Sequence, residues 1–203
     1  NASWPDLIRI LDGRTDADLE RWSRVWVNSA GRPDFRIQTG QDGKLALLQH
    51  DPAGNGRVWP QRFTVRSVAE GIFPLLTIDS GAAVTPLPDL PAGAARALLF
   101  NADGMGYGLF PADPDLLGRW DILRPVERGS ALVTLYERLL AGSLQEVEAY
   151  LAALLAILET EENQLLLDLA MGQLSRIYRS LLPEAAQARH RPRLERVLWQ
   201  RLR

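Results

Sequence analysis

The feature that most constrains the fold is a change in hydrophobic period partway along the chain. Between residues 35 and 111 the apolar runs are short, and prolines and glycines separate them. From residue 113 to 203, apolar residues instead recur every three or four positions, as on one face of an α-helix. The sequence therefore predicts a multi-domain α+β protein in which a strand-rich region precedes an all-helical one.

The strand-rich region, residues 35–111, is expected to form an Ig-like β-sandwich. The segment from Arg62 to Arg66 alternates apolar and polar residues, so one face of that strand should be buried. No helical pattern lies between the candidate strands, which favours a sandwich. The candidate strands are residues 35–38, 44–49, 62–66, 73–78, 94–101 and 107–110.

The helical region, residues 112–203, is expected to form a bundle or a superhelix. Helices are predicted over 127–140, from Ser143 with a capping-box glutamate at position 146, over 161–182, and from about Pro192. Short turns between them favour antiparallel neighbours. No clean repeat period is present, so the superhelix is the weaker of the two interpretations.

Residues 1–34 form a third, helical region. Ser3 is a candidate N-cap for a helix that ends near Leu11, and a second helix is predicted from Thr15. Its apolar residues fall at helical spacing and form one stripe: Leu19, Trp22, Val25 and Trp26. Gly31 and Pro33 then end the helical pattern.

Composition excludes several classes of protein. Hydrophobic residues make up 46% and charged residues 24% of the 203 residues, which argues against global disorder. The net charge of −2 gives no bulk electrostatic reason to bind nucleic acid or an anionic membrane. The lack of cysteine excludes disulfides and thiolate metal sites, but it does not fix the compartment. No apolar run approaches the roughly 18–20 residues that span a bilayer.

No complete catalytic constellation is recognisable, so we assign no catalytic, cofactor-binding or metal-binding residue. His50 and His190 are far apart in the sequence and lack zinc-protease spacing; we interpret them as a loop and a surface-helix histidine, although a site with Asp or Glu stays open in principle. Ser80 and Ser130 lie in no nucleophile-elbow pattern.

Three further segments carry polar or glycine-rich patterns that we interpret structurally. Asp103 to Gly108 lacks the lysine of a phosphate-binding loop and is expected to be a tight turn that leads into a strand. The carboxylates at positions 159, 161 and 162 suggest a solvated helix start, with acid–base or metal chemistry as the alternative. The arginines from 189 to 203 suggest the solvated face of an amphipathic helix, with a membrane surface or an acidic partner as the alternative.

The six tryptophans are spread over all three regions, and packing within and between domains is expected to account for most of them. They are Trp4, Trp22, Trp26, Trp59, Trp120 and Trp199.

The order of these segments resembles the C-terminal part of the aminopeptidase N family of zinc aminopeptidases. Trp22, Trp26, Gly31 and Pro33 match a tryptophan–tryptophan–glycine–proline spacing that leads from the last catalytic-domain helix into the family's β domain. Asn101 to Gly108 resembles the family's final β strand. Residues 116–123 and 128–135 resemble the start of its helical domain.

This resemblance implies a non-catalytic role for the chain. Residues 1–34 would be the helical tail of a separate catalytic domain, which the other two regions would support and partly enclose. That domain would bind zinc through a His-Glu-x-x-His motif and a downstream Glu, and it would remove N-terminal residues from peptides. Neither this motif nor the family's Gly-x-Met-Glu-Asn segment occurs in the chain, so zinc is expected only in a longer parent protein.

Two hypotheses follow, and the exposure of the tryptophans helps to separate them. The first is the accessory region of a zinc aminopeptidase, and the second is a stand-alone binding or scaffolding protein. Because the sequence opens with Asn1 and not methionine, we expect it to be a piece of a longer protein. The first hypothesis predicts that Trp22 and Trp26 leave an apolar patch exposed, since their packing partner would be absent.

Overall fold

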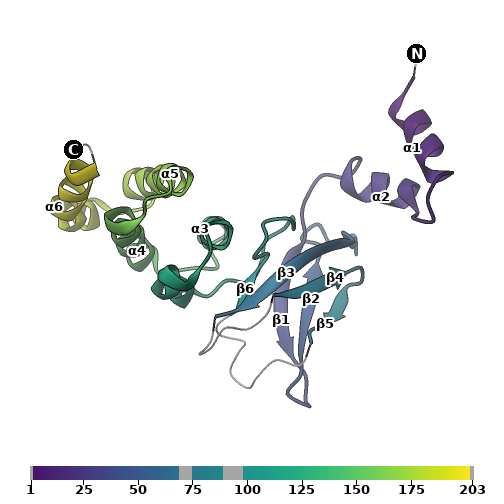
Figure 1. Cartoon of the computed structure of the whole chain (residues 1–203), viewed down its shortest axis with the longest axis horizontal. Coiled ribbons are helices and arrows are strands. Elements are labelled where there is room, and N and C mark those ends of the chain that lie inside the picture. The colour runs from purple at the N-terminus through teal and green to yellow at the C-terminus, as the bar shows by residue number, and fades with distance from the viewer. Residues whose placement is uncertain (1, 69–74, 89–97, 202–203) are drawn as a thin grey trace.

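The computed structural model describes residues 2–68, 75–88 and 98–201, and these form a mixed α and β structure. The described residues contain seven helices and two small antiparallel sheets of three strands each. The sheets lie between a short N-terminal arm of two helices and a longer C-terminal arm of helices, with an opening between the arms (Figure 1). The expected mixed composition of the fold is therefore confirmed.

The N-terminal arm is a pair of short helices, α1 (Trp4–Asp12) and α2 (Leu19–Trp26). The Asp6 carboxylate accepts hydrogen bonds from the backbone and hydroxyl of Ser3, which fixes the start of α1. The second helix begins at Leu19, whereas the sequence suggested a start at Thr15. Asp18 caps it by accepting from the Arg21 N–H, and the Asp12 carboxylate accepts from the Leu19 N–H.

The two sheets have the strand orders β1-β2-β5 and β4-β3-β6. The strands are β1 (Asp34–Thr39), β2 (Leu45–His50), β3 (Gln61–Ser67), β4 (Leu76–Ser80), β5 (Val84–Pro86) and β6 (Leu98–Phe100). Both sheets contribute to one buried apolar cluster. At its centre, the ring of Phe110 lies 4.7 Å from that of Phe35 and 4.9 Å from that of Phe63.

Two strand predictions need correction. β5 was not predicted from the sequence, because its three residues give too short a pattern. Residues 107–110 do not form a strand: only Leu109 bridges to the sheet, exchanging hydrogen bonds with Pro33 O and the Phe35 N–H. Gly108, with φ of +151°, breaks the extended backbone before that bridge. Parts of two predicted strands, residues 73–74 and 94–97, lie outside the described residues.

The C-terminal arm begins with a 3-10 segment, η2 (Pro114–Ile122). It continues with α3 (Pro125–Leu140), α4 (Val147–Thr160), α5 (Gln164–Ser180) and α6 (Glu184–Arg201). A leucine-rich core joins α3, α4, α5 and α6. Inside it, the Tyr150 hydroxyl donates to Gln173, whose amide donates to Leu132 O, so the buried polar groups are paired across three helices. No described helix has the length and apolar character needed to cross a membrane.

Three predicted helix boundaries were wrong. The helix expected from Ser143 begins at Val147, because the Ser143 hydroxyl donates to Arg138 O at the end of α3 and does not act as a cap. The next begins at Gln164, capped by the Asn163 side chain. α6 begins at Glu184 and runs through Pro192. Its buried residues lie on both sides of that proline, so packing holds the helix together across the missing N–H.

α3 binds the sheets through buried charged groups. The Arg138 guanidinium donates to the carbonyl oxygens of Phe35, Leu109 and Phe110, and it pairs with Asp34 at 3.0 Å. Burial lowers the pKa of Arg138, and the nearby Asp34 carboxylate opposes this shift. These contacts hold one helix against three backbone carbonyls and one carboxylate of the β region.

Two further contacts extend this junction along α3. Arg66 on β3 pairs at 3.0 Å with Glu127, whose side chain is fully buried. The Ser130 hydroxyl donates to Asn101 O. A separate apolar cluster also crosses the boundary between the regions; it consists of Val68, Leu99, Ala102, Leu116, Leu123 and Ala131. The sheets and the C-terminal arm therefore share a continuous interior.

Replacing Arg138 with methionine tests this junction. The change keeps the length of the side chain but leaves Asp34 and the buried carbonyls without their partner. We expect the free energy of unfolding to fall by about 3 kcal/mol, measured by urea denaturation. Arg9→Met is the control, because the Arg9 side chain is 73% exposed and forms a surface pair with Asp6, so a loss below about 0.5 kcal/mol is expected. Equal losses in the two variants would contradict the assigned role of Arg138.

Candidate functional site

The two histidines lie far apart in the structure. His50 is exposed at the end of β2, whereas His190 lies on α6 with Nε2 3.0 Å from a Glu148 carboxylate oxygen. Across residues 2–68, 75–88 and 98–201, no three or more histidine or acidic side chains are grouped so that they could hold a metal ion. His190 lies on a helix as interpreted from the sequence, whereas His50 is the last residue of strand β2 and not a loop residue.

The two serines considered as nucleophiles have structural partners. Ser80 is buried, and its hydroxyl accepts from the Gln49 amide, which also donates to Trp59 O. Ser130 donates to Asn101 O at the junction between α3 and the sheets. Among the described residues, no histidine or carboxylate is a hydrogen-bond partner of either hydroxyl.

Glu161, one of three clustered acids, is a buried structural anchor. Its carboxylate accepts from the Trp120 indole N–H at 2.8 Å and from Arg128 at 3.0 Å, and it also accepts from the backbone N–H groups of residues 162 and 163. Burial alone would raise the pKa of Glu161, but the Asn163 N–H, Trp120 and Arg128 together bring the pKa below its ordinary value. The predicted solvated helix start is therefore wrong for this residue, although Glu162 is exposed.

The basic residues of α6 are mostly paired within the chain. Arg189 and His190 both bind Glu148, Arg191 binds Glu195, and Arg193 binds Glu159. Arg201 donates to the carbonyl oxygens of residues 158 and 161 at the end of α4. Apart from the pair of Arg191 and Glu195 within α6, these contacts join α6 to α4 and its C-terminal end, and they favour the structural interpretation of the arginine-rich helix.

The tryptophans differ from the sequence expectation, because three of them are exposed. Trp59 is buried, but 41% of Trp4, 41% of Trp22 and 67% of Trp199 is accessible to solvent. Trp26 is partly buried against Tyr107, with the ring centroids 5.9 Å apart. Packing within the chain therefore covers Trp26 in part but leaves Trp4 and Trp22 of the N-terminal arm exposed.

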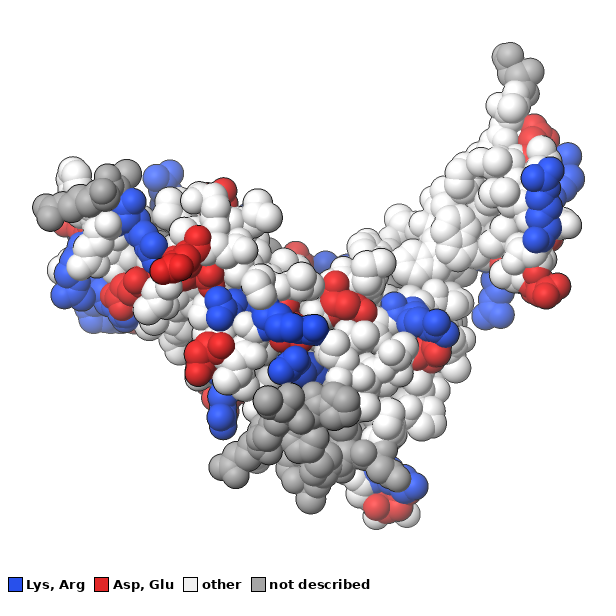
Figure 2. Space-filling model, viewed as in Figure 1, with Lys and Arg blue, Asp and Glu red and all other residues white. Residues whose placement is uncertain are grey.

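The N-terminal arm carries a concentrated set of exposed apolar side chains, here named the hairpin surface. It consists of Trp4, Leu7, Ile10, Leu11 and Trp22. In the view of Figure 2, the charged side chains of α1 and α2 lie on the outer side of the arm, and its inner side, which faces the opening, is mainly uncharged. This is the distribution expected of a surface that contacts another body.

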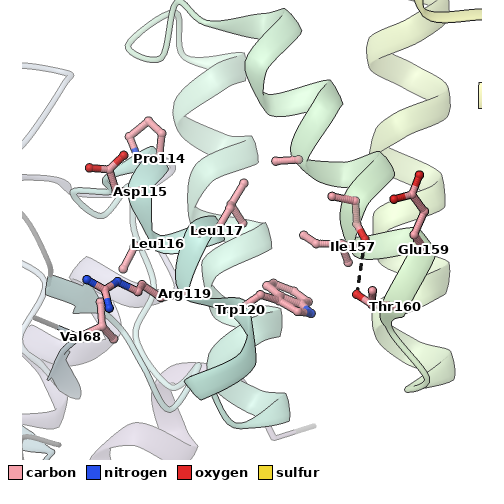
Figure 3. A pocket seen from close by; sticks show the side chains of 13 residues that line it. Val68, Pro114, Asp115, Leu116, Leu117, Arg119, Trp120, Ile157, Glu159 and Thr160 are labelled. Carbon is pink, nitrogen blue, oxygen red and sulfur yellow. Dashed lines mark hydrogen bonds between the residues drawn. The ribbon is translucent and has the colours of Figure 1, made fainter. Parts of the chain in front are cut away.

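A cavity of about 820 Å³ lies between η2 and α4, a volume within the range of ligand pockets. In Figure 3, Leu117 and Trp120 from η2 face Ile157 from α4, and charged groups lie at its edges. Its lining residues are Val68, Pro114, Asp115, Leu116, Leu117, Gly118, Arg119, Trp120, Ala153, Ala156, Ile157, Glu159 and Thr160. Most lining residues are apolar, and the polar groups are the carboxylates of Asp115 and Glu159, the Arg119 guanidinium and the Thr160 hydroxyl, so the cavity suits mainly apolar contact.

Sequence reasoning missed this cavity and the buried ion pairs at the ends of α3. The cavity forms from helices whose packing is set by the tertiary structure, and no local pattern marks it. The pairs could not be read from the sequence, because Arg66 and Asp34, the partners of Glu127 and Arg138 in the sheets, lie far from them along the chain.

Glu161→Gln tests the anchoring role of this carboxylate. We expect a loss of about 2–3 kcal/mol in unfolding free energy at pH 7, because Arg128 loses its charged partner. The folded-state pKa is lowered, so the carboxylate stabilises the fold above its unfolded pKa of about 4.3 and loses this effect as the pH falls through the folded value. The difference in unfolding free energy between the natural protein and the variant should therefore shrink in acid, as measured by thermal unfolding from pH 7 to pH 2. A difference that stays constant over this pH range would contradict the anchoring role of Glu161.

Comparison with known proteins yields no match, either to a family model or to a curated protein. The likeness to the aminopeptidase N family therefore depends on the residues quoted from the sequence. Of these, Trp22 belongs to the hairpin surface, and Trp26 on the same helix contacts residues 101–108 through Tyr107.

Proposed function

We propose that the chain is the non-catalytic C-terminal portion of a zinc-dependent aminopeptidase. In this proposal, residues 35–111 are an Ig-like β-sandwich, residues 112–203 are an all-α bundle or superhelix, and residues 1–34 are the tail of a separate catalytic domain. The sandwich and the helical domain support that domain and partly enclose its active site. Zinc and the groups that cleave the peptide belong to the separate domain, as the family resemblance implies.

The observation that carries the proposal is the exposed hairpin surface. α1 and α2 have nine and eight residues, too few for stable isolated helices, and between them only Ile8 and Ser23 are buried. A pair of helices with so small a core needs an external surface to cover its apolar side. The exposure of Trp22 is the outcome expected if that covering body is a separate domain.

The arrangement of the two arms also supports the proposal. Both arms border one opening above the sheets, so a body that covers the hairpin surface would also lie near the C-terminal helices (Figure 1). The helical arm is held to the sheets by Arg138 and Glu127, which gives it a fixed orientation toward that body. Such a framework would limit the access of peptides to the active site of the separate domain.

A stand-alone binding or scaffolding protein is the second candidate. The hairpin surface favours it equally, since an unrelated protein could cover the same tryptophans. The two candidates differ in what precedes Ser3 in the natural protein. A zinc-binding His-Glu-x-x-His motif upstream favours the aminopeptidase, and a natural start near Ser3 favours the scaffold.

Metal content and aminopeptidase activity test the proposal directly. Both are measured on this 203-residue chain and on the longer natural protein, by elemental analysis and with aminoacyl reporter substrates. We expect about one zinc ion per molecule and hydrolysis in the longer protein only. Tight zinc binding with hydrolysis by the 203-residue chain would overturn the non-catalytic role. Neither property in the longer protein would favour the scaffold.

A further inference from the structure

α4 is apolar on all sides, although the structure fully covers only one of them. The segment from Ala149 to Leu158 carries no charged side chain, which is typical of a helix that is buried all round. One side lies in the core of the C-terminal arm, where four leucines are fully buried: Leu151, Leu154, Leu155 and Leu158. On the side that lines the η2–α4 cavity, Ala153 is half-buried and Ala156 is exposed. The composition of α4 therefore indicates that this second side also has an apolar contact.

Small side chains on α4 create the cavity. Ala153 and Ala156 end at Cβ, so they leave space between their helix and the Leu117 and Trp120 side chains of η2 (Figure 3). The resulting volume of about 820 Å³ is that of a site for a drug-sized molecule. Water in an apolar space of this kind finds few hydrogen-bond partners, so an apolar molecule displaces it favourably.

The η2 wall of the cavity is held in place by several contacts. The Trp120 indole N–H donates to Glu161 at 2.8 Å, and the Arg128 guanidinium lies 5.5 Å from the centre of the Trp120 ring. Arg128 also donates to Trp120 O. Leu116, the neighbour of Leu117, is buried in the apolar cluster shared with the sheets. These contacts keep η2 from closing onto the alanines, so a ligand would enter a preformed site and order little of the protein.

The polar groups of the lining determine the chemistry of the ligand. The Thr160 hydroxyl donates to a backbone carbonyl oxygen of its own helix, and the Glu159 carboxylate accepts from Arg193. Asp115 and Arg119 are exposed and lie at the edge of the cavity (Figure 3). Within the described part of the chain, the interior of the cavity thus offers no free side-chain donor or acceptor. A charged group placed there would lose its water without gaining a partner.

We propose that the η2–α4 cavity binds an uncharged, mainly apolar small molecule. Its apolar body contacts Leu117, Trp120 and Ile157, and any polar group that it carries lies at the edge of the cavity, in contact with water. The cavity is in the C-terminal arm, and the sheets separate it from the hairpin surface (Figure 1). The assignment therefore does not depend on the proposed function.

The place of binding is tested on the natural 203-residue chain with an uncharged dye, N-phenylnaphthylamine. We expect nuclear Overhauser contacts between the dye and the methyl groups of Ala153, Ala156 and Ile157. Contacts only with Leu7 and Ile10 would place the dye on the hairpin surface and overturn the inference. A longer natural protein that no longer binds the dye in the cavity would assign the cavity to another segment of that protein, and this too would overturn it.

A pair of dyes that differ by one charge tests the class of ligand. Anilinonaphthalene sulfonate has the same ring system as N-phenylnaphthylamine and adds a sulfonate. In fluorescence titrations of the 203-residue chain, we expect the uncharged dye to bind with a dissociation constant at least tenfold lower. Equal or tighter binding of the sulfonate would overturn the uncharged class of ligand, because Arg119 would then hold the charge.

Substitution of one alanine provides a further readout. Ala156→Phe fills the cavity with a ring, so we expect the dissociation constant of the uncharged dye to rise at least tenfold. Ala185→Phe is the matched control, because Ala185 is also an exposed alanine on a helix, α6, and does not line the cavity. Equal effects of the two variants would overturn the inference, as would a dimer that dissociates in the Ala156→Phe variant, since a second copy would then occupy the cavity. If the Ala156→Phe variant does not fold, the contacts measured on the natural chain decide the assignment.

Discussion

The interactions of α3 with the sheets are the constraint on which the rest of the structure depends. One arginine, Arg138, binds three carbonyl oxygens of the small β region, and it neutralises Asp34 beside them. Glu127, near the other end of the helix, is fully buried and accepts from Arg66. Buried charges are costly unless both partners stay in place, so these pairs specify one relative position of helix and sheets. The core of the C-terminal arm is then built upon α3.

The N-terminal arm presents the opposite situation. Its helices are well capped, with Asp6 and Asp18 binding the first turns, yet they bury almost no apolar surface. Local signals therefore define the helices while packing within the chain does not stabilise them. Such a mismatch between good capping and a poor core is understandable if the stabilising contacts come from another body, which is the basis of the proposed function.

The sequence predicted elements where a local signal decides the structure. The alternation from Arg62 to Arg66 gave β3, and the leucine spacing after residue 144 gave α4 and α5, because side-chain period depends only on the backbone of that segment. Boundaries failed where a distant or competing partner decides: Ser143 binds the end of α3, and Pro192 is tolerated inside α6 because residues on both sides are packed. The same distinction between local and distant determinants applies to the candidate surfaces. Exposure was predicted for both Trp22 and Trp26 on α2; Trp22 is exposed, but Trp26 is partly buried against Tyr107. The loop at residues 101–108 depends on Gln61, 46 residues from Tyr107, and the η2–α4 cavity depends on packing alone.

The buried position of Glu127 has a consequence for how the molecule could be divided or recombined. The patterns of the sequence place a boundary at residue 112, and a cut there would look natural. Such a cut would separate Arg66 from Glu127, and Arg138 from the carbonyl oxygens that it binds. It would also expose the apolar cluster of Val68, Leu99, Leu116 and Ala131 to water. The helical segment would then carry a buried carboxylate with no cation from the sheets. Strands and helices that look modular in sequence would thus be inherited and exchanged as a single piece.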